Sequence, residues 1–93
     1  MGVKFTVSYH PAVMLEDVPK LSTSVQRRIK QAIEQKLTTF PEQFGKPLRR
    51  SLAGYRKLRV GDYRVVFRIE GRTVKIFLIQ HRSVVYMHTN RFL

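Results

Sequence analysis

The sequence predicts an α+β fold in which an N-terminal strand, a helical hairpin and a three-stranded antiparallel meander follow one another. Three observations predict it: strand-like alternation over residues 1–9, helix-like spacing over residues 11–40, and two glycine turns within residues 55–86. Helices packed on one face of a mostly antiparallel four-stranded sheet accommodate all three segments. At this length we expect a single domain over residues 1–93.

The first strand and the first helix are indicated by alternation and by proline. Apolar and polar side chains alternate from Met1 to Tyr9, as in a half-buried strand. We expect a short helix from Pro11 to about Val18, because proline suits the first helical turn. Pro19 is expected to end this helix, since the residue before a proline avoids the helical region.

The second helix has both a predicted start and a predicted end. Thr23 and Gln26 have the spacing of a capping box, and Pro41 is expected to stop the helix. Residues 41–53 are then expected to form a connection, and the residues after Tyr86 one last turn. The apolar positions of the helix keep helical spacing and form its buried stripe: Val25, Ile29, Ala32, Ile33, Leu37 and Phe40.

The last three strands form two hairpins that share a middle strand. Two-residue turns at Gly61 and Gly71 place Val65 opposite Leu58 in the first hairpin and opposite Leu78 in the second. Paired residues share a face, so one face is a predicted core face: Leu58, Val60, Tyr63, Val65, Phe67, Ile69, Val74, Ile76 and Leu78. The opposite face, called here the basic face, is expected to hold no carboxylate and to carry Tyr55, Lys57, Arg59, Arg64, Val66, Arg68, Lys75, Phe77, Ile79 and His81.

The charge of the chain is strongly positive and unevenly distributed. The formal net charge is +12, and residues 46–93 hold twelve Lys/Arg against two Asp/Glu. This concentration on the hairpins and their flanks predicts an anionic partner, such as nucleic acid, a membrane surface or an acidic protein. The chain has no apolar run of membrane-spanning length and no cysteine. We therefore expect a cytoplasmic protein without a membrane partner.

The residue types exclude most catalytic chemistries. The sequence has no glycine-rich phosphate loop, no HExxH motif and no Cys/His cluster, and its six acidic residues are scattered. We therefore expect no cofactor and no metal. Arginine, lysine, tyrosine and histidine on one face suit metal-free RNA cleavage, in which a 2′-OH attacks the neighbouring phosphate. That reaction needs fixed cations, a proton acceptor and a proton donor.

Arg64 is the central candidate for this chemistry. It lies in the middle of the predicted basic face, where a guanidinium can clamp a phosphate with two parallel hydrogen bonds. Lys57 and Arg59 flank it as further positive charge. The alternative is that the stem of Arg64 only covers the edge of the apolar strip.

The candidates for proton transfer and base stacking are His81, Tyr86, Tyr55 and Phe77. Histidine changes its protonation state near neutral pH, so His81 can serve as acid or base together with Tyr86. Tyr55 and Phe77 offer rings on which bases can stack. The alternatives are a strand-end role for His81 and simple packing for Tyr86. The convergence of both residues near Arg64 favours the functional interpretation.

Three segments of the chain resemble the RelE/ParE family of small bacterial and archaeal toxins: KLRVGDYRVVFRI, VKIFLI and HRSVVY. The resemblance covers nearly the whole chain. RelE-type members cut mRNA in the ribosomal A site and leave a 2′,3′-cyclic phosphate, whereas ParE-type members inhibit DNA gyrase. Members of both types are held inactive by a cognate antitoxin.

The resemblance implies a role for several residues. Arg64 matches the phosphate-stabilising arginine of the family, Tyr86 its C-terminal catalytic tyrosine, and Lys57 one of its sheet lysines. The catalytic arginine expected before the tyrosine falls at His81 or Arg82, and a second sheet lysine is replaced, because its position falls at Tyr55 or Arg56. With the charge pattern of the basic face, the predicted catalytic set is Arg64, Tyr86, His81 and Arg82. The predicted RNA- and phosphate-binding residues are Lys57, Arg59, Arg68, Lys75 and Tyr55.

Together these inferences predict a type II toxin that acts as a ribosome-dependent mRNA endoribonuclease and inhibits translation. Its expected partners are mRNA in the ribosomal A site and a cognate antitoxin, which can dock on the apolar strip of Val66, Phe77 and Ile79. One alternative is a gyrase inhibitor without nuclease activity. The other is a non-catalytic module that binds RNA or DNA.

Overall fold

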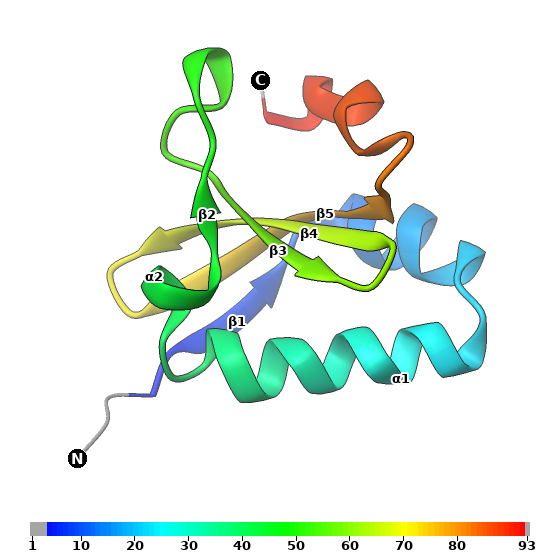
Figure 1. Cartoon of the computed structure of the whole chain (residues 1–93), viewed down its shortest axis with the longest axis horizontal. Coiled ribbons are helices and arrows are strands. Elements are labelled where there is room, and N and C mark those ends of the chain that lie inside the picture. The colour runs from blue at the N-terminus through cyan, green and yellow to red at the C-terminus, as the bar shows by residue number, and fades with distance from the viewer. Residues whose placement is uncertain (1–3, 93) are drawn as a thin grey trace.

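The computed structural model describes residues 4–92 and has the predicted α+β architecture, a mostly antiparallel sheet with the long helix packed on one face (Figure 1). The sheet has five strands instead of the expected four, because residues 46–47 add a short edge strand. Strand β1 runs parallel to β5, and the other neighbours are antiparallel. The strand order is β1 (Thr6–Tyr9), β5 (Thr73–His81), β4 (Tyr63–Glu70), β3 (Arg56–Val60) and β2 (Lys46–Pro47).

The first helical segment extends further than predicted. It contains a π-helical turn, η1 (Val13–Asp17), and a 3₁₀ turn, η2 (Val18–Lys20). Pro19 does not end the helix, because it occupies the first turn of η2, where no helical bond needs its missing N–H. The chain leaves the helical region at Leu21, which has an extended conformation.

The second helix begins one residue before its predicted cap. Ser22 is the N-cap of α1 (Thr23–Ala32), and its hydroxyl accepts a hydrogen bond from the Val25 N–H at 3.3 Å. Thr23 is therefore the first helical residue, and the predicted capping box is wrong. The Gln26 amide instead donates to the carbonyls of Val18 and Leu21, at 2.9 and 3.0 Å. These bonds join α1 to the end of η2.

The predicted stripe of the second helix is confirmed, except at its last position. The helix continues as the π-helical segment η3 (Ile33–Leu37), and Ile29, Ile33 and Leu37 are all buried. Phe40 is 51% exposed, because the chain has already left the helix there. A short helix, α2 (Pro41–Phe44), then leads into β2.

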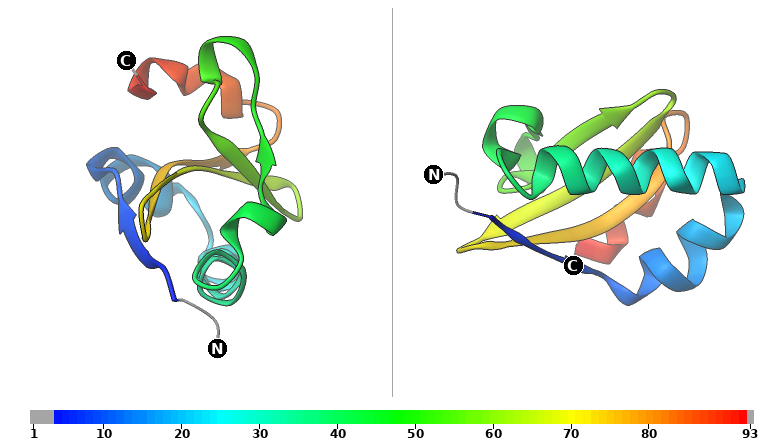
Figure 2. Two further views of the ribbon diagram at one scale, coloured as in Figure 1. Left: turned by 90° about the vertical axis from the view of Figure 1, so that its left-hand side faces the viewer. Right: turned by 90° about the horizontal axis from the view of Figure 1, so that it is seen from below.

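Two segments lie on the sheet face that points away from α1, as Figure 2 shows. One runs from β2 through the 3₁₀ turn η4 (Arg50–Leu52) to β3. The other is the C-terminal segment η5 (Val85–Phe92), a 3₁₀ helix longer than the single turn that was expected. These segments flank the face that carries the predicted site.

A β-bulge changes the register of the last hairpin. Pairing of β3 with β4 is as predicted, but pairing of β4 with β5 shifts between Val66 and Phe67, so that Phe77 becomes an extra residue. Val65 therefore lies opposite Ile79, and Val66 opposite Leu78. The prediction that placed Leu78 on the core face and Ile79 on the basic face is wrong, because a shift of one residue exchanges the two faces.

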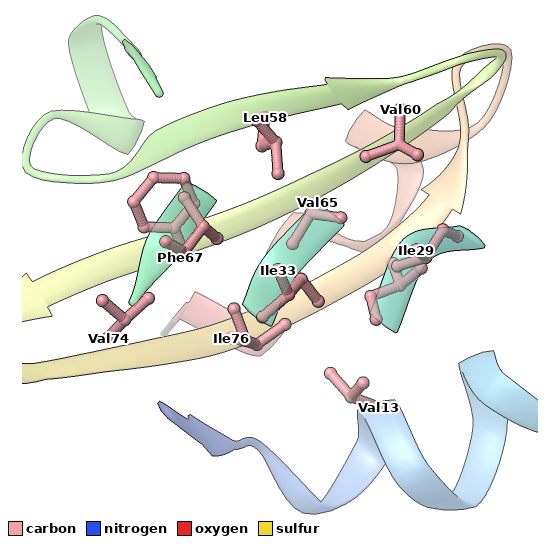
Figure 3. Close-up of a cluster of buried hydrophobic side chains, with 11 residues drawn as sticks. Val13, Ile29, Ile33, Leu58, Val60, Val65, Phe67, Val74 and Ile76 are labelled. Atoms are coloured by element: carbon pink, nitrogen blue, oxygen red, sulfur yellow. The ribbon is translucent and has the colours of Figure 1, made fainter. Parts of the chain in front are cut away.

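The sheet consequently separates two apolar clusters. The larger lies between the helices and the sheet, and Figure 3 shows most of its side chains. It includes Val13, Ile29, Ile33, Leu37, Leu58, Val60, Val65, Phe67, Val74, Ile76 and Ile79. The smaller contains Val66, Leu78 and Val85, with Leu48 and Tyr55 packed against it. It attaches η5 and the β2–β3 connection to the basic face.

Candidate functional site

The basic face holds its central cations in the predicted arrangement. Arg64 in β4 lies between Arg59 of β3 and Gln80 of β5 in the strand register. Lys57 is paired with Val66, two residues along the same strands, so that Lys57, Arg59 and Arg64 share one face. The sequence therefore placed these three side chains correctly.

Arg64 is held by the backbone of the adjacent turn. Its Nη1 donates to the carbonyl oxygens of Gly61 and Tyr63, at 3.0 and 2.9 Å, and the residue is half-buried. None of the ion pairs within the described part of the chain includes Arg64. The guanidinium charge is thus not compensated by a carboxylate, and its Nε and Nη2 hydrogens are available to an anion.

Tyr86 stands beside this face on η5. Its neighbour Val85 is buried in the smaller apolar cluster, whereas Tyr86 itself is 48% exposed. The Lys57 ammonium lies over the Tyr86 ring, 6.0 Å from the ring centroid. The fold therefore brings together two residues that are far apart in the sequence and that were both predicted for the site.

His81 does not lie on the face of Arg64. In the shifted register it pairs with Tyr63, and the two rings meet edge to face with centroids 5.5 Å apart. Its Nδ1 lies 2.8 Å from the Ser83 hydroxyl oxygen and accepts a hydrogen bond from the Ser83 N–H. The predicted position of His81 on the basic face is wrong, and the bulge at Phe77 is the cause.

Arg82 lies at the β3–β4 turn. Its backbone N–H donates to the Asp62 carbonyl at 2.8 Å, and its Nε is 3.9 Å from an Asp62 carboxylate oxygen. Both side chains are largely exposed, so this ion pair is weak.

The predicted stacking residues lie together near the other end of the face. The rings of Tyr55 and Phe77 meet edge to face with centroids 5.1 Å apart, and the Arg68 guanidinium lies 5.7 Å from the Tyr55 centroid. Glu70 is within 4 Å of both Arg68 and Lys75. The expectation of a face without carboxylates is therefore wrong at this end.

The predicted apolar docking strip is mostly covered. Val66 is 1% exposed beneath Val85, and Ile79 belongs to the larger core on the opposite face of the sheet. Phe77 alone remains partly accessible among the three predicted residues. The prediction of an open strip is wrong, because the C-terminal segment packs over its centre.

Sequence reasoning missed a buried ion pair between Asp17 and Arg91. The Asp17 carboxylate is fully buried and accepts hydrogen bonds from the Ile79 N–H, the Gln80 amide and both terminal nitrogens of Arg91, at 2.5–2.9 Å. The hydrogen bond with Asp17 raises the pKa of Arg91. This cluster fixes η5, which carries Tyr86, against η1 and β5. No local pattern signals the pair, since its members are separated by 74 residues.

The described residues have two further properties that bear on function. No group of three or more His, Cys, Asp or Glu side chains among them is arranged to hold a metal ion. Within residues 4–92, no helix has both the length and the apolar character needed to cross a bilayer.

Comparison with known proteins identifies relatives over most of the chain. The model of the family described as "ParE toxin of type II toxin-antitoxin system" matches residues 8–86. Toxin RelG of Mycobacterium tuberculosis is 38% identical over 72 residues, which span 75% of this chain and 83% of RelG. Toxin RelE of the same organism is 34% identical over 83 residues, or 84% of this chain and 86% of RelE.

Solved structures agree with these matches. The crystal structure of the RelBE2 toxin–antitoxin complex from Mycobacterium tuberculosis contains a chain with a TM-score of 0.80 and 34% identity, covering 87% of this chain and 94% of that one. The RelB–RelE complex from Methanococcus jannaschii gives a TM-score of 0.64 at 20% identity, covering 86% and 95%, which is a likeness of fold. The chain therefore belongs to the RelE/ParE family of type II toxin–antitoxin toxins.

Proposed function

We propose that this toxin is a ribosome-dependent mRNA endoribonuclease that works in the cytoplasm and inhibits translation. The observation that carries the proposal is the Lys57–Tyr86 contact on the face that also presents Arg64. A half-buried guanidinium with free donors and an exposed phenol beside an ammonium are the groups that metal-free phosphodiester cleavage requires. A surface used only for docking has no need of a proton-transfer group.

The proposed reaction is an attack of the RNA 2′-oxygen on the adjacent phosphorus. The P–O bond to the 5′-oxygen breaks, and the products are a 2′,3′-cyclic phosphate and a free 5′-OH. The free Nε and Nη2 donors of Arg64 stabilise the negative charge that develops on the phosphate oxygens. The Tyr86 hydroxyl accepts the proton that leaves the 2′-OH and donates a proton to the departing 5′-oxygen, and Lys57 binds the phosphate beside it.

The remaining predicted residues take supporting roles in this proposal. His81 is turned toward Tyr63, so the geometry favours Tyr86 over His81 for proton transfer. Arg59, Arg68, Lys75 and Arg82 hold the RNA backbone, and Tyr55 with Phe77 offers rings for stacking.

A cognate antitoxin is the second proposed partner. Support comes from the RelBE2 relative, whose structure is a toxin–antitoxin complex. With Val66 and Ile79 buried, a different apolar surface suits the antitoxin: a pocket of about 290 Å³ between η1, η2 and α1, beside the exposed Met14 and Leu15. Exposed apolar groups next to such a pocket are typical of protein-binding surfaces.

A gyrase inhibitor without nuclease activity is the second candidate function. It is favoured by the matching family model, which describes ParE toxins over residues 8–86. In that case the basic face is a docking surface, and the Lys57–Tyr86 contact has no chemical role.

The deciding experiment is primer extension on mRNA held by purified programmed ribosomes. Wild-type protein should cut at A-site codons, whereas Arg64→Ala and reactions without ribosomes should not. Arg72→Ala is the matched control, because Arg72 is exposed in the β4–β5 turn and should leave cleavage unchanged. Antitoxin binding by Arg64→Ala verifies that it is folded. Absence of cleavage by folded, antitoxin-free wild type would favour gyrase as the target.

A further inference from the structure

A second cationic site lies outside the basic face, at the edge of the sheet. A pocket of about 240 Å³ is formed where the helix α1–η3 passes the end of β3 and the following turn. We call it the edge pocket. Its polar lining comes from Arg28, Gln31, Gln35, Lys36 and Arg59, and Gly61 closes it at the turn.

The three cations of the edge pocket are not neutralised. No ion pair within residues 4–92 involves Arg28, Lys36 or Arg59. Two carboxylates lie close to these cations in the sequence, those of Glu34 and Asp62, but neither residue lines the pocket, and the Asp62 carboxylate is 3.9 Å from the Arg82 Nε. Uncompensated positive charge around a polar pocket suits an anion.

Two of these cations are held in place by local contacts. A Cβ at Gly61 would lie 3.2–3.3 Å from Cζ and both terminal nitrogens of Arg28, so the end of the guanidinium occupies the space beside Gly61 that a side chain there would need. Gly61 also has a φ of +59°, which favours glycine there independently. The Lys36 ammonium lies 5.6 Å from the centroid of the Phe44 ring. The site is therefore partly preorganised.

Arg59 connects the edge pocket to the basic face. It is paired with Arg64 in the sheet and also lines the pocket. Strand β2 covers only Arg56 and Lys57 of β3, so among residues 4–92 no strand pairs with the edge of β3 beyond Lys57. The cations thus run without interruption from Arg64, across Arg59 at the sheet edge, to Arg28 on the helix.

The pocket chemistry favours a phosphodiester backbone over an acidic protein. The two apolar residues that line the pocket, Ala32 and Val60, are partly or fully buried, so neither offers the exposed apolar anchor that protein partners usually need. Arginine and lysine with side-chain amides are instead the groups that contact phosphate oxygens in nucleic-acid complexes.

We propose that the edge pocket binds a phosphate of an RNA backbone, beyond the segment that occupies the basic face. The Arg28 guanidinium donates hydrogen bonds to the phosphate oxygens, and the Lys36 ammonium, about two turns further along the helix, adds positive charge. This inference rests on the proposed function in one respect, namely that RNA is taken as the polyanion that binds. Nothing in the binding step requires cleavage.

The test measures how salt weakens RNA binding. Fluorescence anisotropy follows the protein binding to a short labelled single-stranded RNA with 2′-O-methyl groups, which removes the nucleophile. Each lost phosphate contact should lower the slope of log K against log salt by about 0.7 between roughly 50 and 200 mM salt. We expect this full loss for the double variant of Arg28→Gln with Lys36→Gln, because the pocket binds one phosphate, and a loss of up to this size for Arg28→Gln alone.

Arg27→Gln is the matched control. Arg27 is the exposed neighbour of Arg28 on the same helix and does not line the pocket. Arg27→Gln removes the same charge as Arg28→Gln, so the salt slope of RNA binding by Arg27→Gln should match that of the wild type. Arg28→Lys should recover the slope, because the slope counts charges. Equal losses for Arg27→Gln and Arg28→Gln, or a double variant with the wild-type slope, would overturn the proposal.

The same variants separate this proposal from the nuclease proposal. If the Arg28 and Lys36 variants lower the salt slope but the wild type does not cleave mRNA, the edge-pocket proposal stands and the nuclease proposal is wrong. If the wild type cleaves mRNA but all variants bind RNA with the same salt slope, the nuclease proposal stands and the edge-pocket proposal is wrong.

Discussion

The contact between Lys57 and Tyr86 is the smallest unit of the proposed site. The ring of Tyr86 makes the contact with the Lys57 ammonium, whereas the proposed reaction uses only the Tyr86 hydroxyl. The two functions can therefore be separated by one substitution.

Tyr86→Phe should lower the rate of mRNA cleavage about 10²- to 10⁴-fold, because it removes the proton-transfer group and keeps the ring. Ribosome affinity should stay the same, since Lys57 keeps its contact with the ring. Single-turnover cleavage on programmed ribosomes measures the first effect, and ribosome pelleting the second. Tyr55→Phe provides the control, because stacking needs only its ring. A Tyr86→Phe variant that cleaves at the wild-type rate would leave the hydroxyl without a role.

The positions of single side chains could be predicted only where the sequence fixes the register. The glycine turn at Gly61 determined the β3–β4 pairing, and Lys57, Arg59 and Arg64 were placed correctly as a result. The bulge at Phe77 was not predictable, because residues 76–79 are all apolar and show no alternation that a one-residue shift would disturb. His81 and Ile79 were misplaced for this reason alone.

At the scale of elements, the C-terminal segment η5 brings Tyr86 to the basic face and so completes the proposed site. Two attachments hold η5: Val85 in the smaller apolar cluster and Arg91 in its ion pair with Asp17. Tyr86 lies between them in the sequence. Loss of the second attachment should therefore weaken both folding and catalysis.

Arg91→Met should destabilise the protein by about 3–5 kcal/mol, because it leaves the Asp17 carboxylate buried without a counter-charge. Urea denaturation measures the change in the free energy of unfolding. Asp17→Asn combined with Arg91→Met should recover part of the loss, since the buried charge is then gone.

Glu16→Gln is the control for this ion pair. Glu16 also approaches Arg91, at 3.7 Å, but its side chain is largely exposed. We expect a change of at most about 1 kcal/mol. If Arg91→Met costs no more than Glu16→Gln, the buried pair does not anchor the segment.

The elements themselves were more predictable than their ends. The stripe of Ile29, Ile33 and Leu37 follows from helical spacing, which any helix on a sheet must satisfy. The cap was missed by one residue, because Ser22 and Thr23 are both good N-caps and residue type does not choose between them. In the structure the Gln26 amide donates to the carbonyls of Val18 and Leu21, and not to the predicted capping box.

At the scale of the whole molecule, the fold separates charge from hydrophobic surface. Helix α1 covers one face of the sheet, as Figure 2 shows, and the larger core lies between the helices and the sheet. Lys57, Arg59 and Arg64 lie on the other face. The sequence already indicated this separation, because residues 46–93 carry a net charge of +10 from twelve basic and two acidic residues. A concentrated field of one sign accelerates encounter with a polyanion.

Two variants of equal net charge can test whether the distribution of charge, and not its total, guides the protein to the ribosome. Arg59→Gln with Arg68→Gln, and Arg27→Gln with Lys30→Gln, each lower the net charge from +12 to +10. The first pair lies on β3 and β4, and the second on α1. Stopped-flow mixing with labelled ribosomes at low salt should show association about tenfold slower for the first pair and nearly unchanged for the second.

The difference between the two pairs should shrink as salt is raised, because screening removes long-range attraction beyond about 8 Å at physiological ionic strength. A difference that persists at high salt would instead indicate direct contacts of Arg59 or Arg68 with RNA. Equal slowing by both pairs at low salt would mean that total charge governs encounter. In that case the orientation of the cations on the sheet serves binding after encounter, and the face acts only at short range.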